Sequence, residues 1–239
     1  MSDLIDVDVD GSVARAFLGL PPGREKHPAV LVTHHREGLS HFTADIVDKL
    51  THIGYLAFSI DNFHAMPRDA DPATYHSLIS DGQLVRDIEA GIRFLGAHPR
   101  NEPGRLGILG HCMGGRTALL GASLFPVFRA AIVFYSGGVF RNRNSSGSTP
   151  GDRLKDIRCP VIGFFGGRDR LIPNTEVDRI ETALKDAGAN PIFHRYPDAG
   201  HAFANFESPD DYREAAARDS WNHTVTFLDR TLNTGTGAP

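Results

Sequence analysis

A glycine-flanked turn between a predicted strand and a predicted helix constrains this chain more than any other feature. The turn, Gly110-His111-Cys112-Met113-Gly114, follows an apolar run from Arg105 to Leu109 and precedes the helical pattern of Thr117 to Leu124. Side chains two positions either side of a residue on such a strained turn would clash with neighbouring backbone, so glycine is required there. The N–H groups at the start of the helix would stabilise a thiolate. We therefore predict that Cys112 is a nucleophile; a buried structural cysteine is the alternative.

Two later loops contain the partners that a nucleophilic cysteine needs. The predicted strand from Pro160 to Phe165 runs into a loop that contains Asp169, and the predicted strand from Ile192 to Tyr196 is followed by His201. Taken singly, Asp169 could be a solvated loop acid, and His201 could be a helix-capping or merely polar residue. The chain order of nucleophile, acid and histidine is that of the α/β-hydrolase triad, with each residue just past the end of a strand. We predict a catalytic triad of Cys112, Asp169 and His201.

Strands alternate with helices over most of the chain. A hairpin is indicated by two alternating segments, Leu4 to Val9 and Ser12 to Leu18, around Asp10-Gly11. Further strands are predicted at Ala29 to Thr33, Tyr55 to Ile60 and Ala130 to Tyr135. Further helices are predicted at Phe42 to His52, Gly82 to His98, Asn174 to Ala187 and Asp211 to Leu232. Two segments are expected to be irregular, Asp61 to Thr74 and Gly137 to Asp152. This order predicts an α/β-hydrolase fold, a mostly parallel sheet with antiparallel N-terminal edge strands and helices on both faces. We expect residues 1–239 to form a single domain, with residues 1–20 as the hairpin and 234–239 as a frayed tail.

Composition favours a soluble enzyme domain. The chain has 239 residues, of which 41% are hydrophobic, which is enough for one large core. A net charge of −4 provides no basic surface for nucleic acid, and no apolar run is long enough to span a membrane. The N-terminal residues are acidic, without the apolar segment of a signal peptide. The two cysteines, Cys112 and Cys159, suit a reducing compartment, so we expect a cytoplasmic location. We also expect a monomer or small homo-oligomer.

From Ala29 to Leu228 the chain resembles the dienelactone hydrolase family, a branch of the α/β-hydrolases that uses cysteine. The resemblance is carried by Gly-His-Cys-Met-Gly-Gly at 110–115, Gly-Gly-Arg-Asp at 166–169, Asp-Ala-Gly-His-Ala-Phe at 198–203 and the predicted helix from Asp87 to Leu95. It implies cleavage of a small lactone or ester through a thioester intermediate, without a cofactor. A carboxylesterase, thioesterase or acyltransferase on the same scaffold is an alternative, and so is a non-catalytic binding protein of this fold.

The chain departs from the family pattern at two positions. His35 stands where the best-known members have a glutamate that contacts the thiol, and Asn205 stands where they have an arginine that binds the substrate carboxylate. Arg68 is a weak candidate for a second carboxylate-binding arginine. With Asn205 in place of that arginine, we expect neutral lactones or esters to be used at least as well as carboxylated ones. His35 is expected either to assist the thiol or to line the pocket and point away from it.

The carboxyl ends of parallel strands form the site in such folds, which brings several polar and aromatic residues together. The predicted pocket residues are His34, His35, His64, Tyr135, Phe203 and Asn205. No pair of the histidines has the H-x-x-x-H spacing of helical metal ligands, so we expect pocket lining and no metal. The backbone N–H groups of Met113 and Arg36 are the predicted oxyanion hole. Arg116 is expected to be structural.

Overall fold

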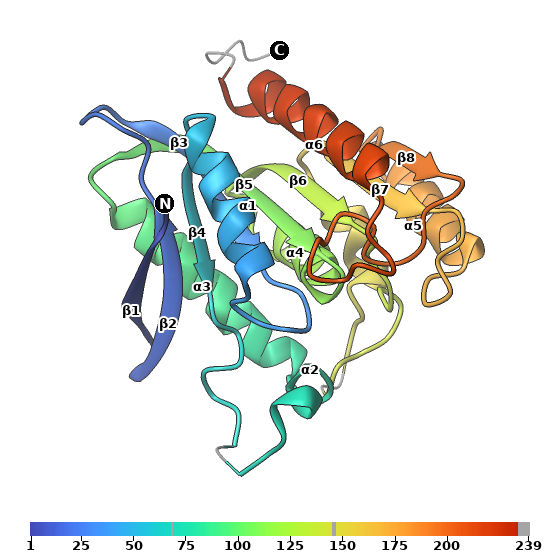
Figure 1. The fold of residues 1–239 in the computed structure, drawn as a ribbon, viewed down its shortest axis with the longest axis horizontal. Coiled ribbons are helices and arrows are strands. Elements are labelled where there is room, and N and C mark those ends of the chain that lie inside the picture. Colours follow the sequence, from blue (N-terminus) through green and yellow to red (C-terminus); the bar gives the residue numbers. More distant parts are fainter. Residues whose placement is uncertain (68, 145–146, 234–239) are drawn as a thin grey trace.

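The computed structural model describes residues 1–67, 69–144 and 147–233, and its strands form one eight-stranded sheet (Figure 1). Arg68 and the predicted frayed tail lie outside the described residues. The strand order is β1-β2-β4-β3-β5-β6-β7-β8. The strands are β1 Asp3–Val9, β2 Ser12–Gly19, β3 His27–Thr33, β4 Leu56–Ile60, β5 Asn101–His111, β6 Phe128–Phe134, β7 Val161–Gly166 and β8 Ile192–Tyr196.

The pairing of the strands confirms the predicted sheet. β1 and β2 form an antiparallel hairpin in which Val9 pairs with Ser12, and β2 joins β4 in antiparallel register. All other neighbouring pairs are parallel. β3, β4, β6, β7 and the second half of β5 are largely apolar and buried because helices cover both faces of a parallel sheet.

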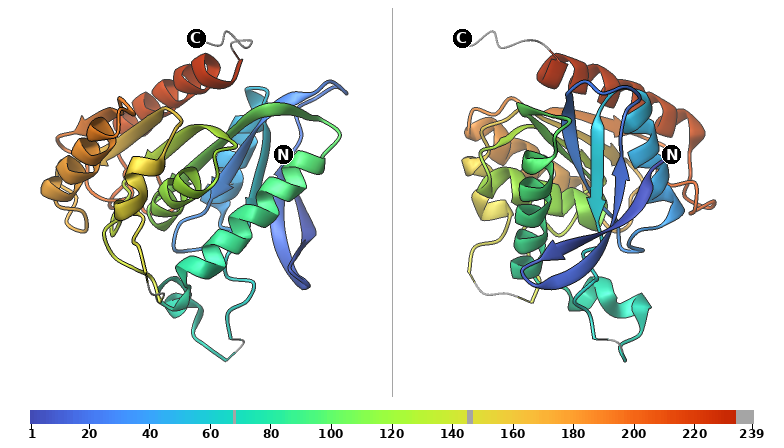
Figure 2. Two further views of the ribbon diagram at one scale, coloured as in Figure 1. Left: turned by 180° about the vertical axis from the view of Figure 1, so that it is seen from behind. Right: turned by 90° about the vertical axis from the view of Figure 1, so that its left-hand side faces the viewer.

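Helices cover the sheet in two layers. Those described are α1 His41–His52, α2 Tyr75–Leu78, α3 Asp81–Ala97, α4 Met113–Leu124, α5 Asn174–Asp186 and α6 Glu214–Leu228. α1 and α6 lie on one face, and α3, α4 and α5 lie on the other, as the edge-on view shows (Figure 2). The side chains of Ser40 and Ser80 accept hydrogen bonds from the first turns of α1 and α3, which fixes where these two helices begin.

Four predicted boundaries differ from the structure by three or more residues. β5 begins at Asn101 rather than at Arg105. α4 begins at Met113 rather than at Thr117, directly after the turn. The predicted helix from Asp211 to Leu232 is shorter at both ends, because α6 begins at Glu214 and a π-helical turn, Asp229–Asn233, follows it. Residues 211–213 instead close a loop, in which the N–H of Arg213 donates to the carbonyl of Phe203. The segment from Asp61 to Thr74 is irregular except for a 3₁₀ turn, Pro72–Thr74, that leads into α2.

Candidate active site

Cys112 lies on the turn between β5 and α4, as the sequence predicts. Its φ angle is +55°, in the left-handed region that a side chain other than glycine rarely adopts. The turn is held from both sides, since the N–H of Cys112 donates to the carbonyl of Phe134 at 3.0 Å and the carbonyl of Cys112 accepts from Arg116 at 3.3 Å. Strain of this kind persists only where the surrounding structure imposes it, and it is characteristic of functional sites.

The glycines that flank Cys112 permit close contact between the turn and the end of β3. A Cβ atom on Gly110 would overlap the carbonyl of Gly114 and the hydroxyl of Thr33, and a Cβ on Gly114 would overlap the carbonyl of Thr33 and lie 2.7 Å from that of His34. The hydroxyl of Thr33 donates toward the carbonyls of Leu109 (3.1 Å) and Gly114 (2.8 Å). The loop that follows β3 is therefore fixed against the start of α4.

Gly114→Ala tests this contact. Because the obstructing atoms belong to backbone, we expect the free energy of unfolding to fall by about 1–3 kcal/mol or more, together with loss of catalytic activity. Gly96→Ala is the matched control, since a Cβ on Gly96 in α3 meets nothing within 4 Å. The control should be neutral or stabilising by up to about 1 kcal/mol. Equal unfolding midpoints in urea for the two variants would contradict the packing argument.

His201 connects Cys112 to Asp169. Its Nε2 atom lies 3.1 Å from Sγ of Cys112, and its Nδ1 atom lies 2.8 Å from Oδ2 of Asp169. The other oxygen of Asp169 accepts from the N–H groups of Leu171 (2.8 Å) and Ile172 (3.0 Å), which orients the carboxylate. The three side chains thus form one hydrogen-bonded series from three different loops, in the arrangement of a nucleophile, a base and an orienting acid.

His201 has a raised pKa. Burial alone lowers the pKa, but the hydrogen bonds to Asp169 and Cys112 and the charges of these two groups raise it to about 10. His201 therefore holds its proton at neutral pH. With both ring nitrogens protonated, Nε2 donates to Sγ of Cys112 and Nδ1 donates to Oδ2 of Asp169.

Stability should depend on pH through this proton. The pKa of His201 is about 10 in the folded chain and near 6.5 in the unfolded chain. The stabilisation that the bound proton of His201 provides is therefore complete below pH 6.5, and it is lost as the pH rises to about 10. We expect the difference in unfolding free energy between the wild type and His201→Gln to shrink over this range, as measured by urea unfolding at several pH values. A difference that stays constant between pH 6 and pH 10 would contradict the raised pKa.

The two backbone N–H groups predicted to form an oxyanion hole, those of Met113 and Arg36, have no hydrogen-bond acceptor among the described residues. Met113 is the first residue of α4, so its N–H has no partner within the helix. Arg36 is in the loop that follows β3. Both residues line the same cavity as Cys112, as a pair of oxyanion donors would require.

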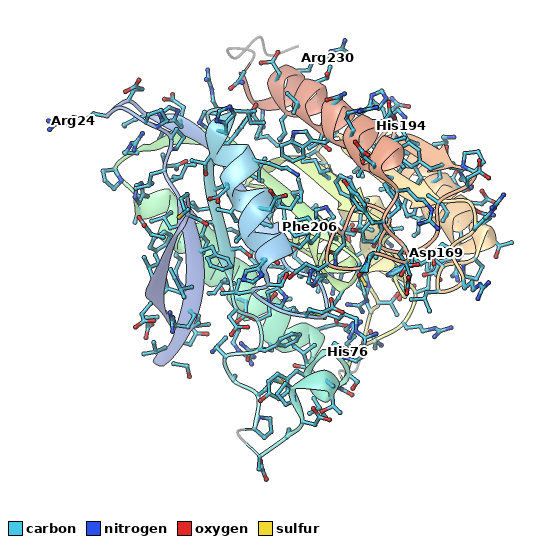
Figure 3. The ribbon with its side chains drawn as sticks, in the orientation of Figure 1. Arg24, His76, Asp169, His194, Phe206 and Arg230 are labelled. Carbon is cyan, nitrogen blue, oxygen red and sulfur yellow. The ribbon has the colours of Figure 1, made fainter. Side chains whose placement is uncertain are left out.

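A cavity of about 710 Å³ lies over Cys112 and His201. Six parts of the chain surround it: the loops that follow β3, β6, β7 and β8, the turn at Cys112, and α2, which carries His76 (Figure 3). The described lining residues are His35, Arg36, Glu37, His76, Cys112, Met113, Tyr135, Arg143, Arg168, Arg170, Leu171, Asp198, Gly200, His201, Ala202, Asn205, Ser208, Asp211 and Arg213. A cavity of this size accommodates a small organic substrate.

Three of the six predicted pocket residues line this cavity, and three do not. His35, Tyr135 and Asn205 are in its wall. His34 and His64 instead join a buried polar network with Asn62 and Asp87, away from the wall. Phe203 is fully buried and packs against the rings of Tyr135 and Tyr196. The expectation that these three line the pocket is therefore corrected: the two histidines are held in the buried network, and Phe203 packs behind Tyr135 rather than beside it in the wall.

The ring nitrogens of His35 have partners other than the thiol. Nδ1 lies 3.1 Å from the N–H of Glu37 and 2.8 Å from its carboxylate, and Nε2 lies 3.2 Å from the hydroxyl of Ser40. The ring also stacks on Phe42. Of the two alternatives from the sequence, this geometry favours a wall residue that points away from the thiol.

Tyr135 and Asn205 differ in how they meet the cavity. Tyr135 packs against His201, and its buried hydroxyl has no hydrogen-bond partner among the described residues. Burial, with the charges of Cys112 and Glu37, raises the pKa of Tyr135 well above 10, so the hydroxyl is protonated. The amide of Asn205 is engaged in its own loop, where its oxygen accepts from the N–H of Glu207 at 2.9 Å.

Several arginines of the cavity wall were not predicted from the sequence. Arg143 comes from the loop predicted to be irregular, and its guanidinium donates to the carbonyl of His76 on α2. Burial and the nearby Arg116 lower the pKa of Arg143. Arg116 itself is buried and makes a two-pronged pair with Asp81 at 2.5 and 2.9 Å, in line with the expected structural role. No motif marked Arg143, because only the fold brings its loop beside Cys112.

Across the part of the chain that the structure describes, no cluster of three metal-binding side chains occurs. None of the described helices is long and apolar enough to cross a membrane.

Comparisons with known proteins point to one family of hydrolases. The sequence model of the dienelactone hydrolase family matches residues 14–232. A Salmonella typhimurium protein named "Putative carboxymethylenebutenolidase" is 31% identical over 211 residues, covering 84% of this chain and 76% of the relative. A Bradyrhizobium protein named "Probable 2-oxo-3-(5-oxofuran-2-ylidene)propanoate lactonase" is 28% identical over 233 residues, covering 95% of this chain and 93% of the relative.

A solved structure extends the agreement to the whole fold. The crystal structure of a Klebsiella pneumoniae protein described as "Putative Dienelactone Hydrolase" superposes with a TM-score of 0.85 at 26% identity, covering 96% of this chain and 98% of the other. With the family model matched over nearly the full length and the same architecture in a solved relative, this chain belongs to the dienelactone hydrolase family of α/β-hydrolases.

Proposed function

We propose that the protein hydrolyses a small lactone or ester through a thioester on Cys112. The observation that carries this proposal is the continuous series from Cys112 through His201 to Asp169, with contacts of 3.1 and 2.8 Å, at the base of the cavity. No cofactor is needed for this chemistry.

The first half of the reaction forms the acyl-enzyme. The thiolate of Cys112 attacks the carbonyl carbon, and a carbon–sulfur bond forms as the carbonyl oxygen becomes an oxyanion. The N–H groups of Met113 and Arg36 stabilise that oxyanion. The carbon–oxygen bond of the ester then breaks, and the leaving alkoxide takes the proton from His201.

The second half releases the product. Neutral His201 removes a proton from a water molecule, whose oxygen attacks the thioester. The carbon–sulfur bond breaks, a carboxylic acid leaves, and the thiolate and imidazolium are restored. Asp169 keeps the ring of His201 in the tautomer and orientation that both halves require. A lactone and one water are thereby converted into one hydroxy acid.

The cavity wall changes the expectation for the substrate's charge. Asn205 alone favours neutral substrates. The arginines of the cavity wall, however, outnumber its carboxylates: the arginines are Arg36, Arg143, Arg168, Arg170 and Arg213, and the carboxylates are Glu37, Asp198 and Asp211. The partly buried guanidinium of Arg143 has lost hydration that a substrate carboxylate would replace. The name of the Bradyrhizobium lactonase contains a propanoate, which is a carboxylate, and this supports a charged substrate. We infer that the preferred substrate is a lactone that carries a carboxylate.

A substrate panel tests both parts of the proposal. Lactones and short aryl esters are assayed with the wild type and Cys112→Ala, and one carboxylated lactone is compared with its methyl ester. We expect kcat/KM for the free acid to exceed that for the methyl ester by roughly tenfold at low salt and to fall as salt is added, because salt screens the arginines. A preference for the methyl ester would contradict the carboxylate assignment, and turnover by Cys112→Ala equal to wild type would contradict the hydrolytic mechanism.

A further inference from the structure

One half of the proposed oxyanion hole depends on the orientation of a single peptide group, between His35 and Arg36. In a trans peptide the carbonyl and the N–H point in opposite directions. The carbonyl of His35 accepts from Nδ1 of His34 at 2.7 Å and from the N–H of Gly38 at 3.2 Å. These two contacts hold the carbonyl on one side of the loop, so the N–H of Arg36 projects to the opposite side.

The tautomer of His34 is determined by its second contact. Nε2 of His34 lies 2.9 Å from the backbone N–H of Asn62, which can only donate, so Nε2 is the acceptor and the ring proton is on Nδ1. His34 is 2% exposed, and burial lowers its pKa. A second ring proton would oppose the N–H of Asn62. The ring is therefore neutral, and its Nδ1–H donates to the carbonyl of His35.

Asn62 is held in turn by a buried carboxylate on α3. The side-chain amide of Asn62 donates to Oδ2 of Asp87 at 3.0 Å, and Asp87 is fully buried. Oδ1 of the same carboxylate contacts Nε2 of His64 at 3.0 Å and the amide of Gln83 at 2.6 Å. The network therefore connects the rigid helix α3 to the loop after β3 through His34. Within this network, Oδ1 of Asn62 and Nδ1 of His64 have no hydrogen-bond partner among the described residues. The contacts that connect Asp87, Asn62 and His34 are all made, and buried hydrogen bonds of this kind make the position of the loop specific.

We propose that His34 is a positioning residue, whose Nδ1–H orients the His35–Arg36 peptide so that the N–H of Arg36 is directed at the oxyanion. His34 itself touches neither substrate nor Cys112 in this role. The inference rests on the proposed function, because it assumes that an oxyanion forms beside Cys112.

Two variants with the same branched skeleton of four side-chain heavy atoms separate this role from simple packing. In His34→Asn, the side-chain amide keeps a donor close to the position of Nδ1, whereas His34→Leu has methyl groups there and no donor. For each variant, kcat and KM are measured with a lactone or aryl ester, and the rate of alkylation of Cys112 by iodoacetamide is measured separately. Alkylation develops no oxyanion, so it reports on the thiolate and His201 but not on the N–H of Arg36.

We expect His34→Leu to lower kcat by about 10²-fold, the effect of losing one oxyanion donor, with KM and the alkylation rate within about twofold of wild type. His34→Asn should recover most of kcat. If His34→Leu does not fold, the smaller His34→Ala takes its place in the comparison with His34→Asn.

Three outcomes would overturn the proposal. The first is a kcat for His34→Leu equal to that of the wild type, and the second is a fall in kcat that is matched by an equal fall in the alkylation rate of Cys112. The third is an equal kcat for His34→Leu and His34→Asn. Cys112→Ala is assayed alongside. If it turns over substrate as fast as the wild type, the proposed function fails independently of His34.

Discussion

Cys112→Ala should lose nearly all hydrolytic activity, with kcat lower by on the order of 10⁴-fold or more, because removal of a triad nucleophile leaves only binding and the oxyanion donors. The variant should fold, since Cys112 is partly exposed and alanine removes one atom from the cavity floor. The assay compares kcat for the wild type and the variant with the substrate identified in the panel. Retention of more than about a tenth of wild-type kcat would exclude Cys112 as the nucleophile.

The second cysteine provides an internal control for the reactivity of Cys112. Cys159 is 5% exposed, and burial raises the pKa of its thiol to about 11, so it holds almost no thiolate at neutral pH. Iodoacetamide should therefore alkylate Cys112 far faster than Cys159 at pH 7, and activity should fall in step with that single modification. Peptide mapping that finds Cys159 labelled first, with activity intact, would contradict the assignment.

Asp169→Asn is expected to lower kcat by about 10⁴-fold with little change in KM, the loss seen when a triad acid is replaced by its amide. The amide can donate to Nδ1 of His201 and so stabilise the wrong tautomer, with the proton on Nε2 beside Sγ. It also removes the carboxylate that helps to keep the pKa of His201 near 10. The contact that changes is the 2.8 Å hydrogen bond between Asp169 and His201.

A surface aspartate is the matched control for this substitution. Asp178 on α5 pairs with Arg195 at 2.8 Å, is mostly exposed and lies outside the cavity lining. Asp178→Asn removes one carboxylate charge as Asp169→Asn does, and a surface ion pair of this kind stabilises by at most about 1 kcal/mol. We expect its kcat to equal that of the wild type. Similar losses in the two variants would mean that net charge rather than the contact with His201 is responsible.

The glycine-flanked turn shows why the local site could be predicted. Gly110 and Gly114 appear in the sequence because any Cβ there would overlap backbone, so the contact leaves a pattern in the residue types themselves. The same holds for the strands around the turn, whose apolar runs reflect burial on both faces of a parallel sheet. Chain order and strand ends then predicted that Asp169 and His201 would meet Cys112, and the structure brings these three side chains together.

The start of α4 shows where prediction from local pattern failed. Met113 to Arg116 contains two adjacent glycines, which disfavour a helix, so the predicted helix begins too late. Contacts with the ends of β3 and β6 outweigh this preference: a Cβ on Gly115 would lie 2.9 Å from the side chain of Ser136 and 3.0 Å from the carbonyl of Phe134. Tertiary packing, not propensity, decides where this helix begins.

The sequence by itself determined the order of strands and helices, the turn at Cys112 and the three loops that carry the candidate triad, because each depends on residues adjacent in the chain. Only the tertiary structure decided which histidines meet the cavity. His34 and His35 are neighbours in sequence, yet one joins Asn62 in a buried network and the other lies in the cavity wall. The hydrogen-bond partner of His34 and the arginines of the cavity wall come from segments distant in the chain. Contacts between such segments produce no local sequence pattern, so the sequence does not predict them.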